Sequence, residues 1–343
     1  MSMVEERPTV VSSIPQDYTK RLMVFGGRAS MELAAKIAGH LGVDVGNVKL
    51  ETFSDGEVYC RYEESIRGAD VFIVQSTAAN PAHGMTPNDA LMELLLMIDA
   101  AQGASAHRII AVTPWYGYAR QDKKSAPREP ISARVVAKCL EGVGVDRVLT
   151  MDLHAGQVQG FFHVPVDHMT AMPMLTQWFM DQAFTEELVI VSPDAGRVKV
   201  ARNFARKIGV HWAVMEKERP AQQVAEIGYV VGDVRGKTAV LVDDMIDTAG
   251  TLCAAARTVL DEGAARVIAT ATHGVFSGPA YERLAYEESG IERIVVTDTI
   301  PLRPGAPENI AVLSTAQTLA DSIRRIFADD SVSEIFAGEN QLF

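Results

Sequence analysis

The alternation of apolar and polar positions along the chain predicts a layered α/β protein. Short, continuous apolar runs occur at residues 22–25, 71–74 and 109–112. Between the first two runs, residues 30–42 have helical spacing, with Leu33 and Ile37 on one face and Gly42 at the end. Uninterrupted apolar strands that alternate with amphipathic helices are typical of a mostly parallel sheet covered by helices on both faces.

The same alternation returns in the second half of the chain, with further apolar runs at 188–191 and 239–242. We therefore expect a loose extension at residues 1–20, followed by two similar α/β domains at residues 21–166 and 167–343. A final helix around Leu319 is placed in the second domain, although it has the option of crossing back to the first.

Composition and charge exclude several classes of protein. Of the 343 residues, 48% are hydrophobic and 22% are charged, which is typical of globular proteins. The net charge of -12 argues against a basic nucleic-acid-binding face. Cys60, Cys139 and Cys253 are too far apart to indicate a disulfide framework or a zinc site. With no secretory signal and no apolar stretch long enough to span a membrane, we expect a soluble, cytoplasmic protein with neither nucleic-acid nor membrane partners.

The strongest chemical signal is VLVDDMIDTAGT at residues 240–251. A predicted strand leads into Asp243 and Asp244, and a small loop then leads into a helix; the loop consists of Asp247, Thr248, Ala249, Gly250 and Thr251. Backbone N–H groups of such a loop converge on a phosphate at the positive end of the helix. If the strand continues, the two aspartates point to opposite faces, so one is available to ribose hydroxyls or metal-bound water. The alternative is an acidic turn that caps the helix.

Two further segments carry groups suited to a nucleotide. FSDGE (53–57) combines an aromatic ring, two carboxylates and a turn glycine. Phe53 is suited to stack on a purine, although a plain hairpin turn explains the segment equally well. YGYARQDKK (116–124) follows a predicted strand, and its Arg120 and Gln121 suit a polyphosphate. The alternative for the second segment is a solvated basic loop.

Two other strand ends carry candidate metal ligands. MDLHAGQVQGFF (151–162) places Asp152 and His154 at alternate positions, and therefore on one face of a strand. A hydrogen-bonded core histidine is the alternative. SPDAG (192–196) sets Asp194 at another strand end, where a helix-capping aspartate is the alternative to a metal ligand.

These segments, together with REPI at 128–131, occur in the order found in ribose-phosphate pyrophosphokinases, and the chain resembles that family over residues 21–338. The resemblance implies two phosphoribosyltransferase-type domains, each with a mostly parallel sheet flanked by helices. It also implies transfer of the β,γ-diphosphate of ATP to the C1 oxygen of ribose 5-phosphate, with Mg²⁺, for nucleotide biosynthesis. The partner implied is a second copy of the chain in a homo-oligomer, commonly a hexamer.

The resemblance also implies a role for each motif. ATP contacts come from Phe53, Asp55, Gly56 and Glu57 of a neighbouring subunit and from Arg120 and Gln121. The metal positions are His154 and Asp194, and the ribose 5-phosphate site comprises Asp243, Asp244, the loop 247–251 and Arg219. Lys217 and Arg219, in EKERP, match the catalytic pair of the family's mobile loop. On sequence alone, a solvated charge run is the alternative for EKERP.

The sequence departs from the common family pattern at a few positions. Ala195 stands where histidine is frequent, Gly156 replaces a proline, and Glu218 stands where many relatives carry a basic residue. These changes remove no charged group to which we assign chemistry.

Two rival functions share part of this pattern. A phosphoribosyltransferase that consumes the diphosphate product shares the 240–251 motif, but it needs neither FSDGE nor YGYARQD. A catalytically silent, regulatory relative is expected to have lost one of the matched groups, such as His154 or Lys217, and the chain retains them.

Overall fold

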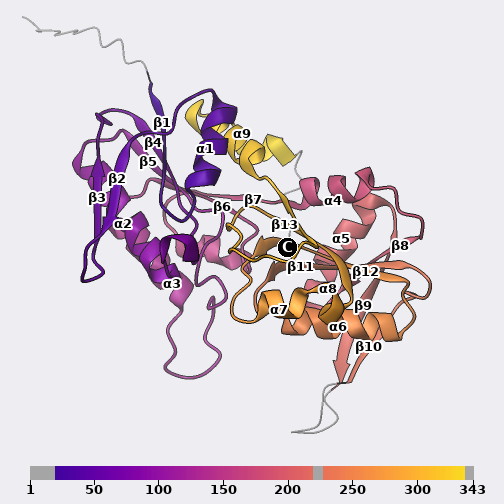
Figure 1. The fold of residues 1–343 in the computed structure, drawn as a ribbon. Coiled ribbons are helices and arrows are strands. Elements are labelled where there is room, and N and C mark those ends of the chain that lie inside the picture. Colours follow the sequence, from indigo (N-terminus) through magenta and orange to yellow (C-terminus); the bar gives the residue numbers. More distant parts are fainter. Residues whose placement is uncertain (1–19, 219–226, 337–343) are drawn as a thin grey trace, which may run out of the picture.

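The computed structural model describes residues 20–218 and 227–336, which form two open sheets flanked by helices (Figure 1). The first sheet has the order β1-β4-β5-β6-β7, and all its neighbouring strands are parallel. Its strands are β1 (Leu22–Gly26), β4 (Asp70–Val74), β5 (Arg108–Val112), β6 (Arg147–Met151) and β7 (Val166–Met169). Its helices are α1 (Met31–Leu41), α2 (Pro87–Gly103) and α3 (Ser132–Gly142). An antiparallel hairpin of β2 (Val48–Thr52) and β3 (Val58–Tyr62) lies at the outer edge of this domain.

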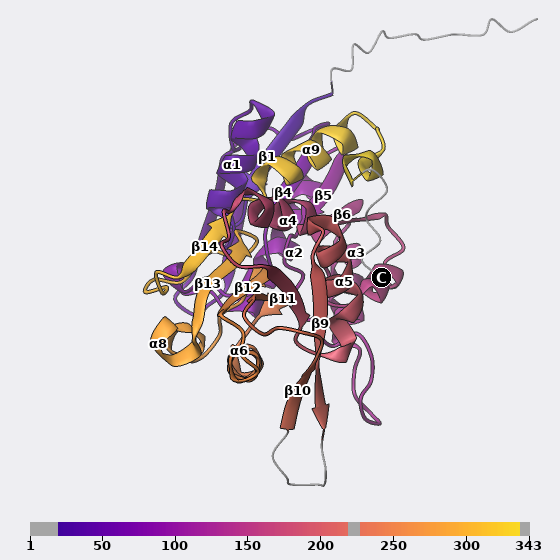
Figure 2. The same ribbon diagram turned by 90° about the vertical axis from the view of Figure 1, so that its right-hand side faces the viewer.

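The second sheet has the order β10-β9-β8-β11-β12-β13-β14, and β10 alone runs antiparallel to its neighbour within the described sheet. Its strands are β8 (Leu188–Ser192), β9 (His211–Glu218), β10 (Ile227–Val231), β11 (Thr238–Ile246), β12 (Arg266–Gly274), β13 (Ile291–Thr297) and β14 (Ile310–Leu313). The helices are α4 (Met172–Asp181), α5 (Val198–Ile208), α6 (Gly250–Asp261), α7 (Ala280–Leu284), α8 (Tyr286–Ser289) and α9 (Ala316–Phe327). Figure 2 shows the β9–β10 hairpin projecting from the body of the molecule.

Local sequence determines where several helices begin and end. α1 ends at Leu41, and Gly42 caps it with a left-handed φ of 75° that lets its N–H bond back to the last turn of the helix. α2 begins with a capping box, in which the Thr86 hydroxyl accepts a hydrogen bond from the Asp89 amide and the Asp89 carboxylate accepts one from the Thr86 amide. Pro87 occupies the first position of α2, where its missing N–H costs no helical hydrogen bond.

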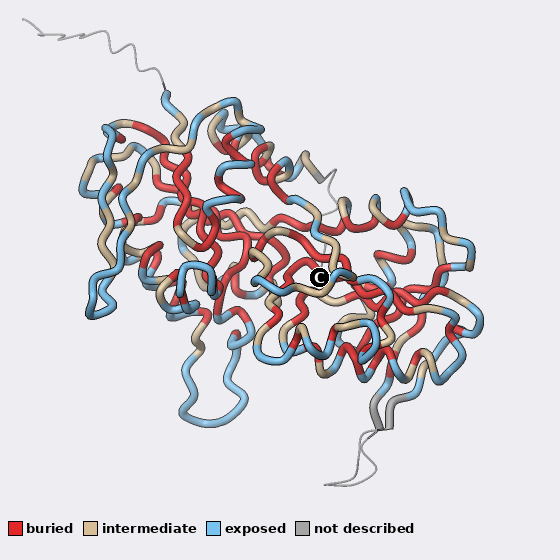
Figure 3. The backbone as a smooth tube through the Cα atoms, viewed as in Figure 1, coloured by how far each residue is buried: buried red, intermediate tan, exposed pale blue. Residues whose placement is uncertain are grey.

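The apolar runs form the buried interior of both sheets. Every residue of β4 and β8 is buried, and Figure 3 shows burial concentrated in the strands and on the inner faces of the helices. The α/β fold with two mostly parallel sheets is therefore confirmed. Within the described residues, no helix combines the length and apolar character needed to cross a bilayer.

The last helix packs on the first domain. Figures 1 and 2 show α9 beside α1, and Leu33 and Ile37 of α1 share a hydrophobic cluster with Leu319 and Ile323 of α9. Just after α9, Asp329 forms ion pairs with Lys20 and Arg108 of the first domain. The last helix therefore crosses back to the first domain. The two sheets divide after β7, which begins at Val166 and ends at Met169.

Candidate active site

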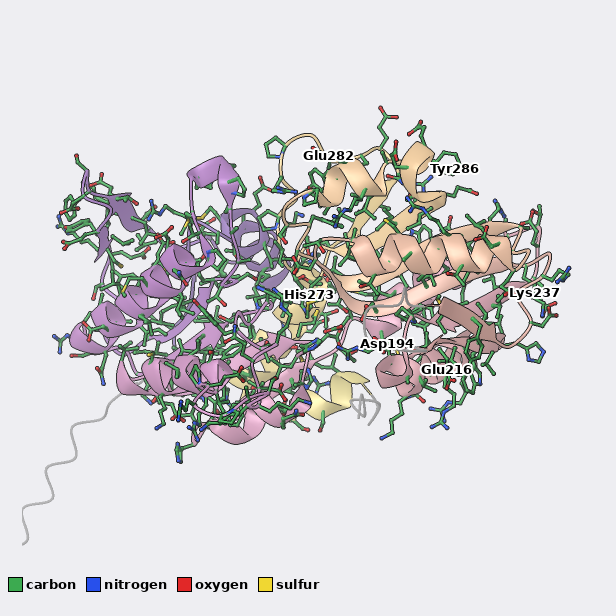
Figure 4. The ribbon with its side chains drawn as sticks, turned by 90° about the horizontal axis from the view of Figure 1, so that it is seen from below. Asp194, Glu216, Lys237, His273, Glu282 and Tyr286 are labelled. Atoms are coloured by element: carbon green, nitrogen blue, oxygen red, sulfur yellow. The ribbon has the colours of Figure 1, made fainter. Side chains whose placement is uncertain are left out.

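Polar side chains from both domains meet at the carboxyl ends of the strands. Figure 4 places Asp194, which follows β8, and His273, near the end of β12, in the middle of the molecule. It places Lys237, just before β11, at the outer end. The carboxyl ends of the second sheet therefore face the first domain, and this is the edge at which open α/β sheets bind ligands.

A nearly buried ionic cluster lies near the end of β11. The guanidinium of Arg197, just before α5, lies 2.6 Å from one carboxylate oxygen of Asp244 and 3.4 Å from one of Asp243. The imidazole Nδ1 of His154 lies 2.8 Å from the other oxygen of Asp244. β11 continues to Ile246, yet both carboxylates reach Arg197, so the expectation that they point to opposite faces was wrong. The Asp244 amide also donates a hydrogen bond to the Asp243 carboxylate (2.8 Å), which ties that side chain to the next residue of the strand.

The surroundings shift the pKa values of the two carboxylates in opposite directions. Burial disfavours ionisation, but the hydrogen bond from His154 and the positive charge of Arg197 hold the pKa of Asp244 below its ordinary value. Burial and the negative charge of Asp244 raise the pKa of Asp243 above its ordinary value. Asp244 is therefore the fixed anion of the pair, and Asp243 is the one that takes up a proton readily.

His154 is positioned by a tight turn rather than by a strand. β6 ends at Met151, and Asp152 adopts a left-handed φ of 37°. The buried Asp152 carboxylate accepts hydrogen bonds from the Ala171 amide (2.8 Å) and the Thr272 hydroxyl (2.6 Å). Placing Asp152 and His154 on one strand face was therefore wrong, because these hydrogen bonds turn the chain away from the sheet.

Asp194 acts as a cap at the start of the segment that carries Arg197. Its carboxylate accepts hydrogen bonds from the amides of Gly196 (2.8 Å) and Arg197 (3.1 Å). The capping role that was the alternative for Asp194 is therefore present. The same hydrogen bonds hold the backbone of Arg197, whose side chain binds Asp243 and Asp244.

The loop after β11 is held by residues from both domains. The Asp247 carboxylate forms an ion pair with Arg120 of the first domain and accepts a hydrogen bond from the Ser277 hydroxyl. Burial alone would raise the pKa of Asp247, but Ser277 and Arg120 lower it below its ordinary value. Ala249 then adopts a left-handed φ of 60°, and α6 begins at Gly250. This is the loop and helix N-terminus geometry that suits a phosphate.

An open cleft of about 560 Å³ lies between the two domains at this point. Arg120 and Gln121 line its first-domain side, and Asp247 and Ser277 line the opposite side. The structure thus brings together the residues expected at the nucleotide phosphates and one end of the loop expected at the sugar phosphate. The cleft therefore presents groups of both domains to one ligand, or to a pair of ligands.

Comparison with known proteins assigns the chain to a family. A family model described as the N-terminal domain of ribose phosphate pyrophosphokinase matches residues 22–144, and a second, described as the phosphoribosyl synthetase-associated domain, matches residues 217–337. Ribose-phosphate pyrophosphokinase of Caldanaerobacter subterraneus subsp. tengcongensis is 50% identical over 320 residues, which cover 93% of this chain and 99% of the relative. The chain belongs to the ribose-phosphate pyrophosphokinase family.

Further relatives agree with this assignment. Ribose-phosphate pyrophosphokinase of Streptomyces avermitilis is 49% identical over 322 residues, covering 92% of this chain and 96% of the relative. The crystal structure of phosphoribosylpyrophosphate synthetase from Mycobacterium smegmatis superimposes with a TM-score of 0.83 at 46% identity. That match covers 90% of this chain and 100% of the other. The fold expected from the family resemblance, with two phosphoribosyltransferase-type domains, is confirmed.

The FSDGE segment forms the turn of the β2–β3 hairpin. The Phe53 amide bonds to the Glu57 carbonyl (2.8 Å), and the Glu57 amide bonds to the Asp55 carboxylate (3.1 Å). Gly56 has the positive φ of 98° that the turn requires. Phe53 is 51% exposed, and the hairpin lies on the side of the first domain away from the second (Figure 1). FSDGE therefore forms a hairpin turn, as the alternative predicted. The turn carries an exposed aromatic ring at its tip.

The expected catalytic pair falls at the edge of the described chain. The backbone of Lys217 lies in β9 and pairs with Gly228 of β10, but its side chain lies outside the described residues. Arg219 lies outside them entirely, and Glu218 ends β9.

Sequence reasoning assigned no role to Arg197 and Ser277, which hold Asp243, Asp244 and Asp247. A weak signal exists for Arg197, since it follows the capping aspartate of SPDAG at the end of a strand. Ser277 has no local signal, because it reaches the loop only through the tertiary fold.

Proposed function

We propose that this ribose-phosphate pyrophosphokinase family member transfers the β,γ-diphosphate of ATP to the C1 oxygen of ribose 5-phosphate, releasing AMP. The observation that carries the proposal is the ion pair between Arg120 and Asp247 across the interdomain cleft. It joins the segment suited to a polyphosphate with the loop suited to a sugar phosphate. Two reactants held in one cleft react as if at high effective concentration, which is most of what phosphoryl transfer needs.

In this proposal the second domain binds ribose 5-phosphate. The N–H groups of Thr248, Ala249, Gly250 and Thr251 receive the 5-phosphate, while Asp243 and Asp244 face the sugar hydroxyls. Asp244 is held by Arg197 and His154, so its orientation is fixed before the sugar binds. Such preorganisation reduces the entropy lost on binding.

ATP is proposed to bind between Arg120 and Gln121 of one subunit and Phe53, Asp55, Gly56 and Glu57 of another. The support is that the FSDGE turn is exposed and lies away from its own interdomain cleft. A turn placed in this way reaches a nucleotide only in a neighbouring subunit. The proposal therefore includes a homo-oligomer, and the family resemblance favours a hexamer.

His154 and Asp194 are proposed to hold Mg²⁺ together with substrate phosphates. The Nδ1 of His154 lies 2.8 Å from a carboxylate oxygen of Asp244 and 2.8 Å from the Arg197 guanidinium, and metal-binding histidines usually engage their other ring nitrogen with a neighbouring carboxylate. In the described part of the chain, no group of three or more His, Cys, Asp and Glu side chains is arranged so that it could hold a metal ion by itself. That donor set fits Mg²⁺, which commonly binds through one or two protein ligands, waters and substrate phosphates. When bound, the ion would neutralise phosphate charge.

The remaining steps of the reaction are proposed to depend on arginine and lysine side chains of the protein. Arg120 releases Asp247 when it turns to the nucleotide phosphates, which frees the Asp247 carboxylate for the incoming sugar. Lys217 and Arg219 are proposed to stabilise the charge that develops on the transferred diphosphate. The attacking C1 hydroxyl gives its proton to solvent water as its oxygen bonds to the β-phosphorus, and AMP departs with the electron pair of the broken bond between the β-phosphorus and the α,β-bridging oxygen.

Phosphorus NMR of the purified protein with ATP, Mg²⁺ and ribose 5-phosphate tests the proposal. We expect AMP and a diphosphorylated sugar to appear together, and only in the complete mixture. Persistence of ATP would favour a silent regulatory relative. Formation of ADP and phosphate would refute attack at the β-phosphorus.

A further inference from the structure

The loop 247–251 is supported from behind by one short segment, residues 276–283, which we name the bracket. Three successive positions, from the end of β11 into the loop, each accept a hydrogen bond from the bracket. The bonds run from the Phe276 amide to the Ile246 carbonyl (3.0 Å), from the Ser277 hydroxyl to the Asp247 carboxylate, and from the Arg283 guanidinium to the Thr248 carbonyl (2.9 Å). A single segment thus fixes both the side chain and the backbone of the loop.

The contact made by Arg283 determines which way a peptide unit of the loop faces. In a trans peptide the C=O and the following N–H point in opposite directions, and the described residues contain no cis peptide. Because the Thr248 carbonyl faces Arg283, the Ala249 N–H faces the opposite side of the loop. Rotation of this peptide by half a turn would present a carbonyl oxygen to a phosphate and repel it.

The backbone that follows this peptide also suits an anion. Ala249 has φ 60° and is 5% exposed, a conformation that alanine adopts only when its surroundings impose it. Left-handed residues that lead into a helix N-terminus turn successive N–H groups toward one point. Ala249, the strained residue, therefore lies directly after the peptide whose orientation Arg283 sets.

We propose that Arg283 is a positioning residue for ribose 5-phosphate binding, acting through the Thr248–Ala249 peptide. The inference rests on the proposed function and adds to it a residue that lies outside the substrate cleft. Arg283 lies on the far side of the loop, in an open groove of about 620 Å³ that Gly250, Cys253 and Arg257 also line. It is close enough that a methyl group on Gly250 would lie 3.3 Å from its Nη1.

The same groove supplies a matched control. Arg257, on α6, carries the same charge and donates to the Glu288 carbonyl (3.1 Å) without contacting the loop. Arg257→Met removes a positive charge from the groove, as Arg283→Met does, but leaves the loop peptide held. If Arg283→Met has an effect that Arg257→Met lacks, that effect is due to loss of the hydrogen bond to the Thr248 carbonyl. Loss of positive charge from the groove is common to both variants.

The test compares the wild type, Arg283→Met, Arg283→Lys and Arg257→Met. We expect Arg283→Met to raise the KM for ribose 5-phosphate about tenfold, the size of effect expected for loss of one charge-assisted hydrogen bond. The KM for ATP and kcat should change by less than about twofold. Arg283→Lys, which keeps a donor, should recover part of the loss, and Arg257→Met should resemble the wild type.

Two measurements separate this inference from the reaction itself. The wild type is first assayed for turnover, and ribose 5-phosphate binding by all four proteins is then measured by calorimetry, with thermal unfolding as a check of folding. If the wild type binds ribose 5-phosphate without turnover, the reaction proposal fails while the calorimetric comparison still decides the role of Arg283. Equal ribose 5-phosphate affinity in Arg283→Met and Arg257→Met would overturn the inference, as would equal weakening for ATP and sugar.

Discussion

Replacing each of the adjacent aspartates at the end of β11 by asparagine is expected to change the stability of the protein differently. In Asp244→Asn, Arg197 loses a negative charge 2.6 Å away, and one of the two oxygens that face Arg197 and His154 becomes an amide nitrogen. In Asp243→Asn, Arg197 loses only a contact at 3.4 Å, and the repulsion between neighbouring carboxylates disappears. We therefore expect Asp244→Asn to destabilise the free enzyme and Asp243→Asn to be neutral or stabilising.

The magnitude follows from burial. The side chains of Arg197 and Asp244 are 17% and 10% exposed, and removing one partner from a buried pair costs about 3–5 kcal/mol. Asp243 remains to neutralise Arg197, and an asparagine oxygen still accepts a hydrogen bond, so we expect a loss of about 2 kcal/mol for Asp244→Asn. In a domain of this size that corresponds to a fall of about 4–8 °C in Tm. For Asp243→Asn we expect a change within about 1 kcal/mol.

Differential scanning calorimetry without nucleotide or divalent ions measures both variants, with pH as a second variable. Because the folded-state pKa of Asp243 is raised, the folded protein binds a proton more tightly than the unfolded chain. The contribution of Asp243 to stability is thus present at low pH and is lost as pH rises from the ordinary carboxyl range through the raised pKa. Asp243→Asn should lack this dependence. An equal loss of Tm in both variants would refute the assignment of Asp244 as the fixed anion.

Three further changes test other parts of the molecule. Thr272→Val removes a donor from the buried carboxylate that turns the chain after β6, so it should cost about 1–3 kcal/mol in thermal unfolding. Thr270→Val, whose buried hydroxyl has no partner among the described residues, should cost nothing. Although burial opposes ionisation of Asp70, hydrogen bonds from Arg108 and His107 lower its pKa. Wild-type stability should therefore fall as pH drops through that lowered pKa, and Asp70→Asn should flatten the curve. Phe53→Ala should raise the KM for ATP severalfold and leave Tm unchanged, since the ring is half exposed; an unchanged KM would remove the hairpin from the nucleotide site.

The fold was largely predictable because burial leaves a direct trace in the sequence. β4 and β8 are buried along their whole length, and all but one residue of each strand is apolar. β10 and β14, which are short and lie at the two edges of the second sheet, were not predicted. Edge strands of this kind obtain their stability from pairing partners that local sequence does not specify.

The site was predictable only where a motif carried it. The loop 247–251 and Arg120 were chosen from their residue types and the family resemblance, and the structure brings them together. The turn at Asp152 was mispredicted because its cause, a hydrogen bond from Thr272, comes from a strand 120 positions away. Ser277 and Arg283 were missed for the same reason, because each acts on a backbone segment distant in sequence.

The position of α9 bears on how the chain is made. α1 buries Leu33 and Ile37 against a helix that begins at Ala316, so this face stays uncovered while the intervening chain is being translated. During synthesis the first domain exposes an apolar surface until α9 leaves the ribosome, and domains otherwise tend to fold in order from the N-terminus. A nascent chain that stops before α9 would therefore carry a complete first sheet with an open hydrophobic face, which makes truncated products targets for chaperones and proteases.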